Sequence, residues 1–110
     1  MITVAIKSPY AANAKHTVEE HVAYARECML DSLKRGEAPF ASHLLYTQVW
    51  DDNKPSERNA GIAAGIEMSR RLDLRVFYID FGWSRGMLLA KEVYDRDGFH
   101  YEVRQLRFPG

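Results

Sequence analysis

The chain has 110 residues, 46% of them apolar, and its 15 Lys plus Arg balance 15 Asp plus Glu. A net charge of zero argues against a partner that is a long nucleic acid or a membrane surface, since binding either usually needs a basic excess. No apolar run reaches the roughly 20 residues of a membrane span, and the first residues lack the features of a signal peptide. We therefore expect one cytoplasmic domain over residues 1–110.

The first half of the chain predicts a strand, a helix and a second short strand. Residues 2–6 are apolar and β-branched, as in a buried strand. Thr17 and Glu20 form a capping-box pattern that begins a helix, and Gly36 ends it. Residues 37–46 predict a short strand and an apolar loop. The helix has its apolar face at Val18, Val22, Ala25, Met29 and Leu33, beside which Cys28 is expected to be a small buried residue.

The second half predicts two further helices, each followed by a strand. Pro55 lies near the first position of a helix whose buried side carries Ile62, Ile66 and Leu72. Residues 74–79 form the clearest central strand, and a loop over 80–86 leads to a helix over 87–97. Residues 100–106 alternate as a final strand.

This alternation of strands and helices predicts an α/β fold with right-handed crossovers. We expect a small flavodoxin-like, or Rossmann-like, three-layer sandwich with a mainly parallel four-stranded sheet. In such folds a ligand binds outside the carboxyl ends of the strands, where the strand order reverses. The loops over 8–13, 42–52 and 80–86 meet that description.

Ser84-Arg85-Gly86-Met87 begins the third helix and has two interpretations. Backbone N–H groups, the Ser84 hydroxyl and the Arg85 guanidinium could bind a phosphate there, or Ser84 could simply cap the helix. The chain contains neither a G-x-G-x-x-G nor a Walker pattern, which excludes the usual NAD(P) and P-loop ATP sites. The four histidines do not follow a ligand spacing, and a single cysteine excludes a cysteine-based zinc site. We expect neither a metal nor another cofactor.

Other residues of the three loops also have two interpretations each. Asp80 follows the central strand and could bind sugar hydroxyls or act in acid–base chemistry, or be a solvated turn residue. Tyr10 and Trp83 could stack on a flat ring or pack against the core. His43 could point into the crevice or bond to a loop carbonyl.

Four stretches of the chain resemble one enzyme family. They are residues 5–10 (Ala-Ile-Lys-Ser-Pro-Tyr), 38–46, 57–61 and 80–87. The chain resembles the nucleoside 2-deoxyribosyltransferase-like family, which includes the 2'-deoxynucleoside 5'-phosphate N-hydrolases. More closely, it looks like the short versions carried by bacteriophages and bacteria. The resemblance implies a flavodoxin-like fold, a dimer, and cleavage or exchange of an N-glycosidic bond. It also implies the cytoplasm of a bacterial host, if the chain is phage-encoded.

The resemblance assigns roles to several loop residues. Ser8-Pro9-Tyr10 would enclose the nucleobase and sugar, Asp80 would be the acidic residue at a strand end, and Ser84 with Gly86 would hold the 5'-phosphate or sugar edge. The complete expected ligand-binding set is Ser8, Pro9, Tyr10, Asn13, His43, Asp80, Trp83, Ser84, Arg85, Gly86 and Met87.

The chain departs from the family at the nucleophile. The family's glutamate lies four residues after the glycine of the helix start, and that position is Ala90 here. Alanine cannot form a glycosyl-enzyme intermediate. Glu92 lies two residues further, about 200° around the helix, and is expected to face elsewhere.

Three functions remain open at this point. In the first, the chain binds a nucleotide or nucleoside-derived molecule without catalysis, for example by sequestering an ADP-ribose-like signal, and a second subunit completes the pocket. In the second, it is an N-hydrolase or deoxyribosyltransferase that uses Asp80 or Glu92. In the third, the crevice is vestigial and the chain is an interaction protein.

Overall fold

The structure is a computed structural model, which describes residues 1–107, and it contains a four-stranded, fully parallel sheet. The spatial order of the strands is β2-β1-β3-β4. Their bounds are β1 Thr3–Lys7, β2 Ala38–Phe40, β3 Leu74–Tyr78 and β4 Tyr101–Arg104. The predicted flavodoxin-like sandwich is confirmed, and each pair of neighbouring strands is parallel.

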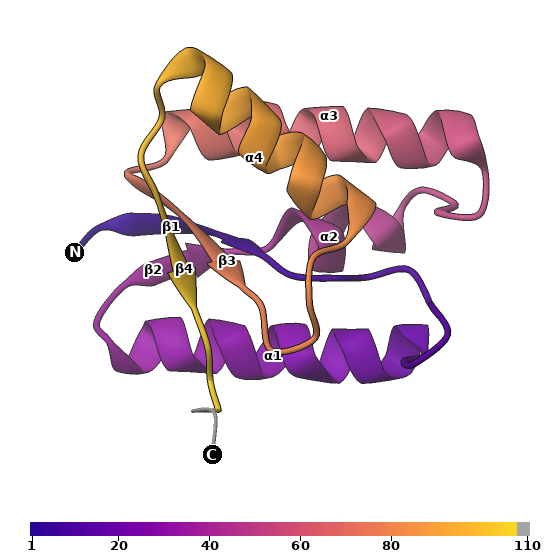
Figure 1. The fold of residues 1–110 in the computed structure, drawn as a ribbon, viewed down its shortest axis with the longest axis horizontal. Coiled ribbons are helices and arrows are strands. Elements are labelled where there is room, and N and C mark those ends of the chain that lie inside the picture. The colour runs from indigo at the N-terminus through magenta and orange to yellow at the C-terminus, as the bar shows by residue number, and fades with distance from the viewer. Residues whose placement is uncertain (108–110) are drawn as a thin grey trace.

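Helices cover both faces of the sheet. Helix α1 (Val18–Lys34) covers one face, and α3 (Pro55–Arg71) with α4 (Arg85–Asp97) covers the other (Figure 1). A short helix α2 (Ser42–Leu45) and a 3-10 turn η1 (Tyr46–Gln48) connect β2 to α3. Because β2 and β3 lie on opposite sides of β1, the strand order reverses between β1 and β3.

The alternation of side chains along the strands divides the core into two clusters. On the α1 face, Val4 and Ile6 of β1 pack with Val76 and Tyr78 of β3. On the other face, Phe77 of β3 packs with residues of α4. Residues of one strand that differ by one position therefore face different helices.

Helix α1 begins as predicted, but its buried face differs from the predicted one. The Thr17 hydroxyl accepts a hydrogen bond from the Glu20 N–H, and the Glu20 carboxylate accepts one from the Thr17 backbone N–H. Leu33 is 56% exposed, so its assignment to the apolar face was wrong. Compared with the predicted orientation, the helix is rotated about its axis so that Tyr24 faces the sheet. The buried face consists of His21, Tyr24, Ala25, Cys28 and Ser32.

Other parts of the chain also differ from prediction, and the strands β1, β3 and β4 are shifted or shortened by one or two residues at their ends. Residues 42–48, expected as strand and loop, are helical. The sequence did not indicate this helix because four residues are too few to show a helical period. Leu72 lies just beyond the end of α3 instead of on its buried side. Helix α4 begins at Arg85, two residues before the predicted start. No helix among residues 1–107 is long and apolar enough to cross a membrane.

Candidate functional site

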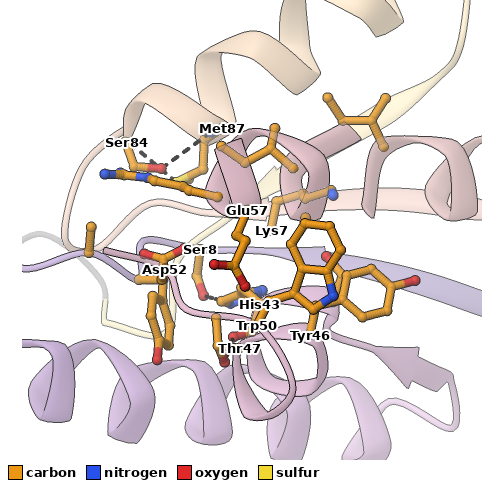
Figure 2. A pocket seen from close by; sticks show the side chains of 18 residues that line it. Lys7, Ser8, His43, Tyr46, Thr47, Trp50, Asp52, Glu57, Ser84 and Met87 are labelled. Atoms are coloured by element: carbon orange, nitrogen blue, oxygen red, sulfur yellow. Dashed lines mark hydrogen bonds between the residues drawn. The ribbon is translucent and has the colours of Figure 1, made fainter. Parts of the chain in front are cut away.

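A pocket lies beside the point where the strand order reverses. Its walls come from the end of β1 and the loop after it, from α2 and η1, from the first half of α3 and from the start of α4. Figure 2 shows Ser84 and Met87 at one edge of the pocket and Tyr46 and Trp50 at another. The predicted position of the crevice, at the carboxyl ends of the strands, therefore agrees with the structure.

Ser8 and His43 meet at the wall of this pocket. Ser8 Oγ lies 2.7 Å from His43 Nε2, so that a residue after β1 is linked to a residue of α2. Burial, together with the nearby charge of Lys7, lowers the pKa of His43 to about 3. His43 is therefore a neutral imidazole at pH 7, able to exchange a hydrogen bond with Ser8.

Lys7 lines the same pocket, although the sequence interpretation did not include it. Val4 and Ile6 face α1, so the alternation along β1 directs Lys7 to the face covered by α3. Burial lowers the pKa of Lys7 to about 8. The alternation of side chains along β1 would have predicted that Lys7 faces the pocket, but the predicted strand ended at Ile6.

The open side of the pocket combines aromatic rings with carboxylates. Tyr10, Tyr46 and Trp50 line it together with Asp52 and Glu57, and Trp50 is 45% exposed. The Glu57 carboxylate accepts a hydrogen bond from the backbone N–H of residue 51 at 3.2 Å and lies 3.7 Å from the Nζ of residue 54. These groups can stack on a flat ring and accept hydrogen bonds from hydroxyl groups.

At the start of α4 the capping interpretation of Ser84 is confirmed. Ser84 Oγ accepts a hydrogen bond from the Met87 N–H at 3.2 Å. Ser84, Gly86 and Met87 all line the pocket. The Arg85 guanidinium points instead toward Asn59, at 3.5 Å, and lines an adjoining groove that shares Tyr10, Trp50 and Arg58 with the pocket.

Asp80, expected in the site, does not line the pocket. Its carboxylate accepts hydrogen bonds from the Tyr24 hydroxyl and from the backbone N–H groups of Leu106 and Arg107. Burial opposes the charge, but these hydrogen bonds outweigh it and hold the pKa of Asp80 below its usual value. Asp80 therefore links β3, α1 and the segment after β4.

Three other expected residues also lie outside the pocket wall. The Trp83 ring packs against Phe77 with the ring centres 4.8 Å apart, as the packing interpretation requires. Pro9 is buried. Asn13 forms a turn in which its side-chain oxygen accepts from the N–H groups of Lys15 and His16.

The position that carries the nucleophile in the resembling enzymes is part of the core. Ala90 is fully buried among Phe77, Met87 and Tyr94. Glu92 is exposed on α4 and does not line the pocket. Among residues 1–107, no group of three or more His, Cys, Asp or Glu side chains is arranged to hold a metal ion.

The chain was also compared with known proteins. No curated protein and no solved structure matches it. One family model, described as a domain of unknown function (DUF7768), matches residues 2–104, which span every strand and helix described above. The chain therefore belongs to the DUF7768 family.

Proposed function

We propose that this protein binds a nucleotide or a nucleoside-derived small molecule without forming a covalent intermediate. The observation that carries the proposal is the position and lining of the pocket. It lies where the strand order reverses, and its walls include three aromatic residues and the start of α4. Sites of this kind in parallel α/β folds bind ligands that combine a flat ring with polar groups.

The lining suits the parts of a nucleoside. Tyr10, Tyr46 and Trp50 offer rings for stacking on a base, and Asp52 with Glu57 offers acceptors for sugar hydroxyls. The resemblance to the nucleoside 2-deoxyribosyltransferase-like family supports the same class of ligand.

The absence of catalysis in this proposal depends on Ala90. This residue is buried in the core, so that a nucleophilic carboxylate is missing where the resembling enzymes have one. A pocket that binds a nucleotide but does not cleave it would lower the concentration of the free ligand. The proposed role is therefore sequestration of a nucleotide signal, such as an ADP-ribose derivative.

Calorimetric titration with AMP, 2'-deoxy-AMP and ADP-ribose tests this function. We expect saturable binding of at least one compound, and Trp50→Ala should weaken it about tenfold or more because the stacking ring is lost. Leu33→Ala is the control, because Leu33 is also an exposed apolar residue but lies on α1 and does not line the pocket. This variant should bind like the wild type. If none of the three compounds binds, the proposal is wrong.

A second candidate, cleavage of the N-glycosidic bond, is favoured by one observation. The carboxylates of Asp52 and Glu57 line the pocket, whereas those of Asp80 and Glu92 do not. Incubation of 2'-deoxynucleotides with the protein, followed by detection of free base, separates the two functions. Base release that is lost in Glu57→Gln or Asp52→Asn but kept in Glu92→Gln would support the enzyme.

We also propose that a second copy of the chain covers the open side of the pocket. Leu45, Val49 and Trp50 are 50%, 77% and 45% exposed. Leu45 ends α2, and Val49 and Trp50 directly follow η1. Trp50 belongs both to this exposed apolar surface and to the pocket wall. A partner subunit placed there would cover the exposed ring of Trp50 and add a wall to the pocket.

A further inference from the structure

Lys7 carries a positive charge into the pocket without a carboxylate beside it. Burial alone accounts for the lowered pKa of this residue, about 8, and no charged or hydrogen-bonded group of residues 1–107 opposes that effect. An ammonium group that is removed from water without a counter-ion is unfavourable. A bound anion would relieve this penalty.

Helix α3 approaches Ser42 closely because residue 65 is glycine, and the Lys7 side chain ends beside the same position. A Cβ at Gly65 would lie 3.6 Å from Lys7 Nζ and 2.5 Å from Ser42 Oγ. The Lys7 ammonium of β1, which is labelled in Figure 2, and the Ser42 hydroxyl of α2 therefore both lie beside the backbone of α3 at Gly65, and both residues line the pocket. Ammonium and hydroxyl groups are both donors to phosphate oxygens.

The charges of the pocket are separated along α3. Glu57 lies in the first turn of the helix, tied to the loop before it, whereas Gly65 lies eight residues further. At 1.5 Å per residue this is about 12 Å. His43, next to the Ser8 hydroxyl, is neutral. Lys7 therefore brings a positive charge to the part of the pocket beside Gly65, whereas the two carboxylates lie toward the start of α3 together with Arg58.

We propose that Lys7, with the Ser42 hydroxyl as a second donor, binds the phosphate group of the ligand at the α3 wall of the pocket. This inference depends on the proposed nucleotide function and places the anion away from the start of α4. There, the Ser84 hydroxyl already caps the helix and the Arg85 guanidinium faces Asn59.

Titration of matched ligands into matched variants tests the assignment. AMP and adenosine differ only by the phosphate, so their ratio of dissociation constants reports on the phosphate subsite. We expect the wild type to prefer AMP, and Lys7→Met to reduce that preference at least tenfold while adenosine affinity is kept. Lys34→Met, which removes an exposed lysine at the end of α1, should leave the preference unchanged.

Arg58→Met separates this assignment from its nearest competitor, because Arg58 also lines the pocket and continues into the outer groove. Loss of the AMP preference in Arg58→Met but not in Lys7→Met would overturn the proposal. Folding is checked by thermal unfolding. Lys7→Met should unfold at a temperature no lower than the wild type at pH 7, since it removes an unpaired buried charge.

A second measurement does not depend on the nucleotide. In protein whose lysines carry ¹³C-methyl groups, the Lys7 resonance should titrate near pH 8 and move to higher pH when inorganic phosphate is added. A Lys7 titration that phosphate does not change would overturn the inference.

The two measurements distinguish this inference from the function on which it depends. If adenosine and AMP bind equally well to the wild type, the nucleotide function stands and the phosphate assignment is wrong. If neither binds but phosphate shifts the Lys7 titration, the anion site stands and the nucleotide function is wrong.

Discussion

The fold opposes protonation of His43. This side chain lies in the pocket wall, bonded to Ser8 and near Lys7, and burial keeps its pKa at about 3. In the unfolded chain the imidazole has its ordinary pKa near 6.5. Between these two values the unfolded state binds more protons than the native state, so stability falls as the pH falls from about 6.5 toward 3.

We predict that His43→Gln makes the protein less sensitive to mild acid. From pH 6.5 to 5 the wild type should lose about 1–2 kcal/mol more of its unfolding free energy than the variant, because one unit of pKa shift corresponds to about 1.4 kcal/mol. Urea unfolding of both proteins at pH 5, 6.5 and 8 measures this difference. Parallel pH profiles for the two proteins would contradict the prediction.

Asp80 makes its hydrogen bonds within the fold and does not line the pocket. Val76 and Tyr78 of β3 face α1, and the same alternation carries Asp80 toward Tyr24 of that helix. Its hydrogen bonds to the backbone of Leu106 and Arg107 then hold the segment after β4. The carboxylate stabilises the native state above its unfolded pKa, and this contribution is lost as the pH falls below it.

We predict that Asp80→Asn lowers the unfolding free energy at pH 7 by about 1–3 kcal/mol, because a partly buried acceptor set is disrupted. Ligand affinity should change less than about twofold, since Asp80 does not line the pocket. Glu92→Gln, at an exposed position of α4, is the matched control and should change stability by less than about 0.5 kcal/mol. Denaturant unfolding together with calorimetry checks both parts. A variant that keeps its stability but loses binding would assign Asp80 to the site.

At the scale of elements, Gly65 determines how closely α3 approaches α2. A Cβ at Gly65 would meet both Oγ and Cβ of Ser42, at 2.5 and 3.1 Å, while a Cβ at Gly61 meets nothing within 4 Å. The two glycines lie four residues apart in the same helix. They therefore form a matched pair in which only one position has a steric reason for glycine.

We predict opposite effects for the two substitutions. Gly61→Ala should stabilise the protein by about 0.5–1 kcal/mol, the helix propensity of alanine over glycine. Gly65→Ala should destabilise it by about 1–3 kcal/mol because α3 or Ser42 must move. Ser42→Ala in the Gly65→Ala background should recover part of the loss. Urea unfolding measures all four proteins, and equal stabilisation by both glycine substitutions would contradict this explanation.

An element could be predicted where neighbouring residues alone specify it. The capping box at Thr17, the apolar strand over 74–79 and the proline at residue 55 are local features that specify a helix start or a strand without knowledge of the rest. Helix α2 could not be found in the same way, because four residues do not complete a recognisable period. The rotation of α1 depends on which side chains fit against the sheet, which is a tertiary property.

The same distinction applies to the site. The alternation of strands and helices predicted a crevice at the carboxyl ends of parallel strands, and the pocket there is lined by the predicted residues Ser8, Tyr10, His43, Ser84, Gly86 and Met87. The sequence could not show that Tyr24 draws Asp80 toward α1. It also could not show that Trp50, which follows η1, and Glu57 of α3 line the pocket. The positions of these two side chains depend on how the helices pack.

At the scale of the whole molecule, the exposed apolar surface formed by Leu45, Val49 and Trp50 gives the proposed dimer a definite test. Val49 is 77% exposed, so a charge there should leave the monomer fold intact but oppose burial against a second copy. We predict that the wild type sediments as a dimer and that Val49→Asp dissociates at least tenfold more readily. Leu33→Asp, at an exposed position in the last turn of α1, should remain a dimer.

Ligand binding connects this assembly to the pocket. If a second copy covers Trp50, then the dimer should bind the nucleotide more tightly than the monomer, and the ligand should in turn favour the dimer by the same factor, because the two equilibria are linked. Sedimentation with and without AMP, and calorimetry of Val49→Asp, measure the two sides of that linkage. A wild-type protein that stays monomeric at 100 µM (about 1 mg/ml for a 12.7 kDa chain) would contradict the shared pocket. So would a Val49→Asp variant that is monomeric yet binds AMP with unchanged affinity, since the second copy then contributes nothing to the site.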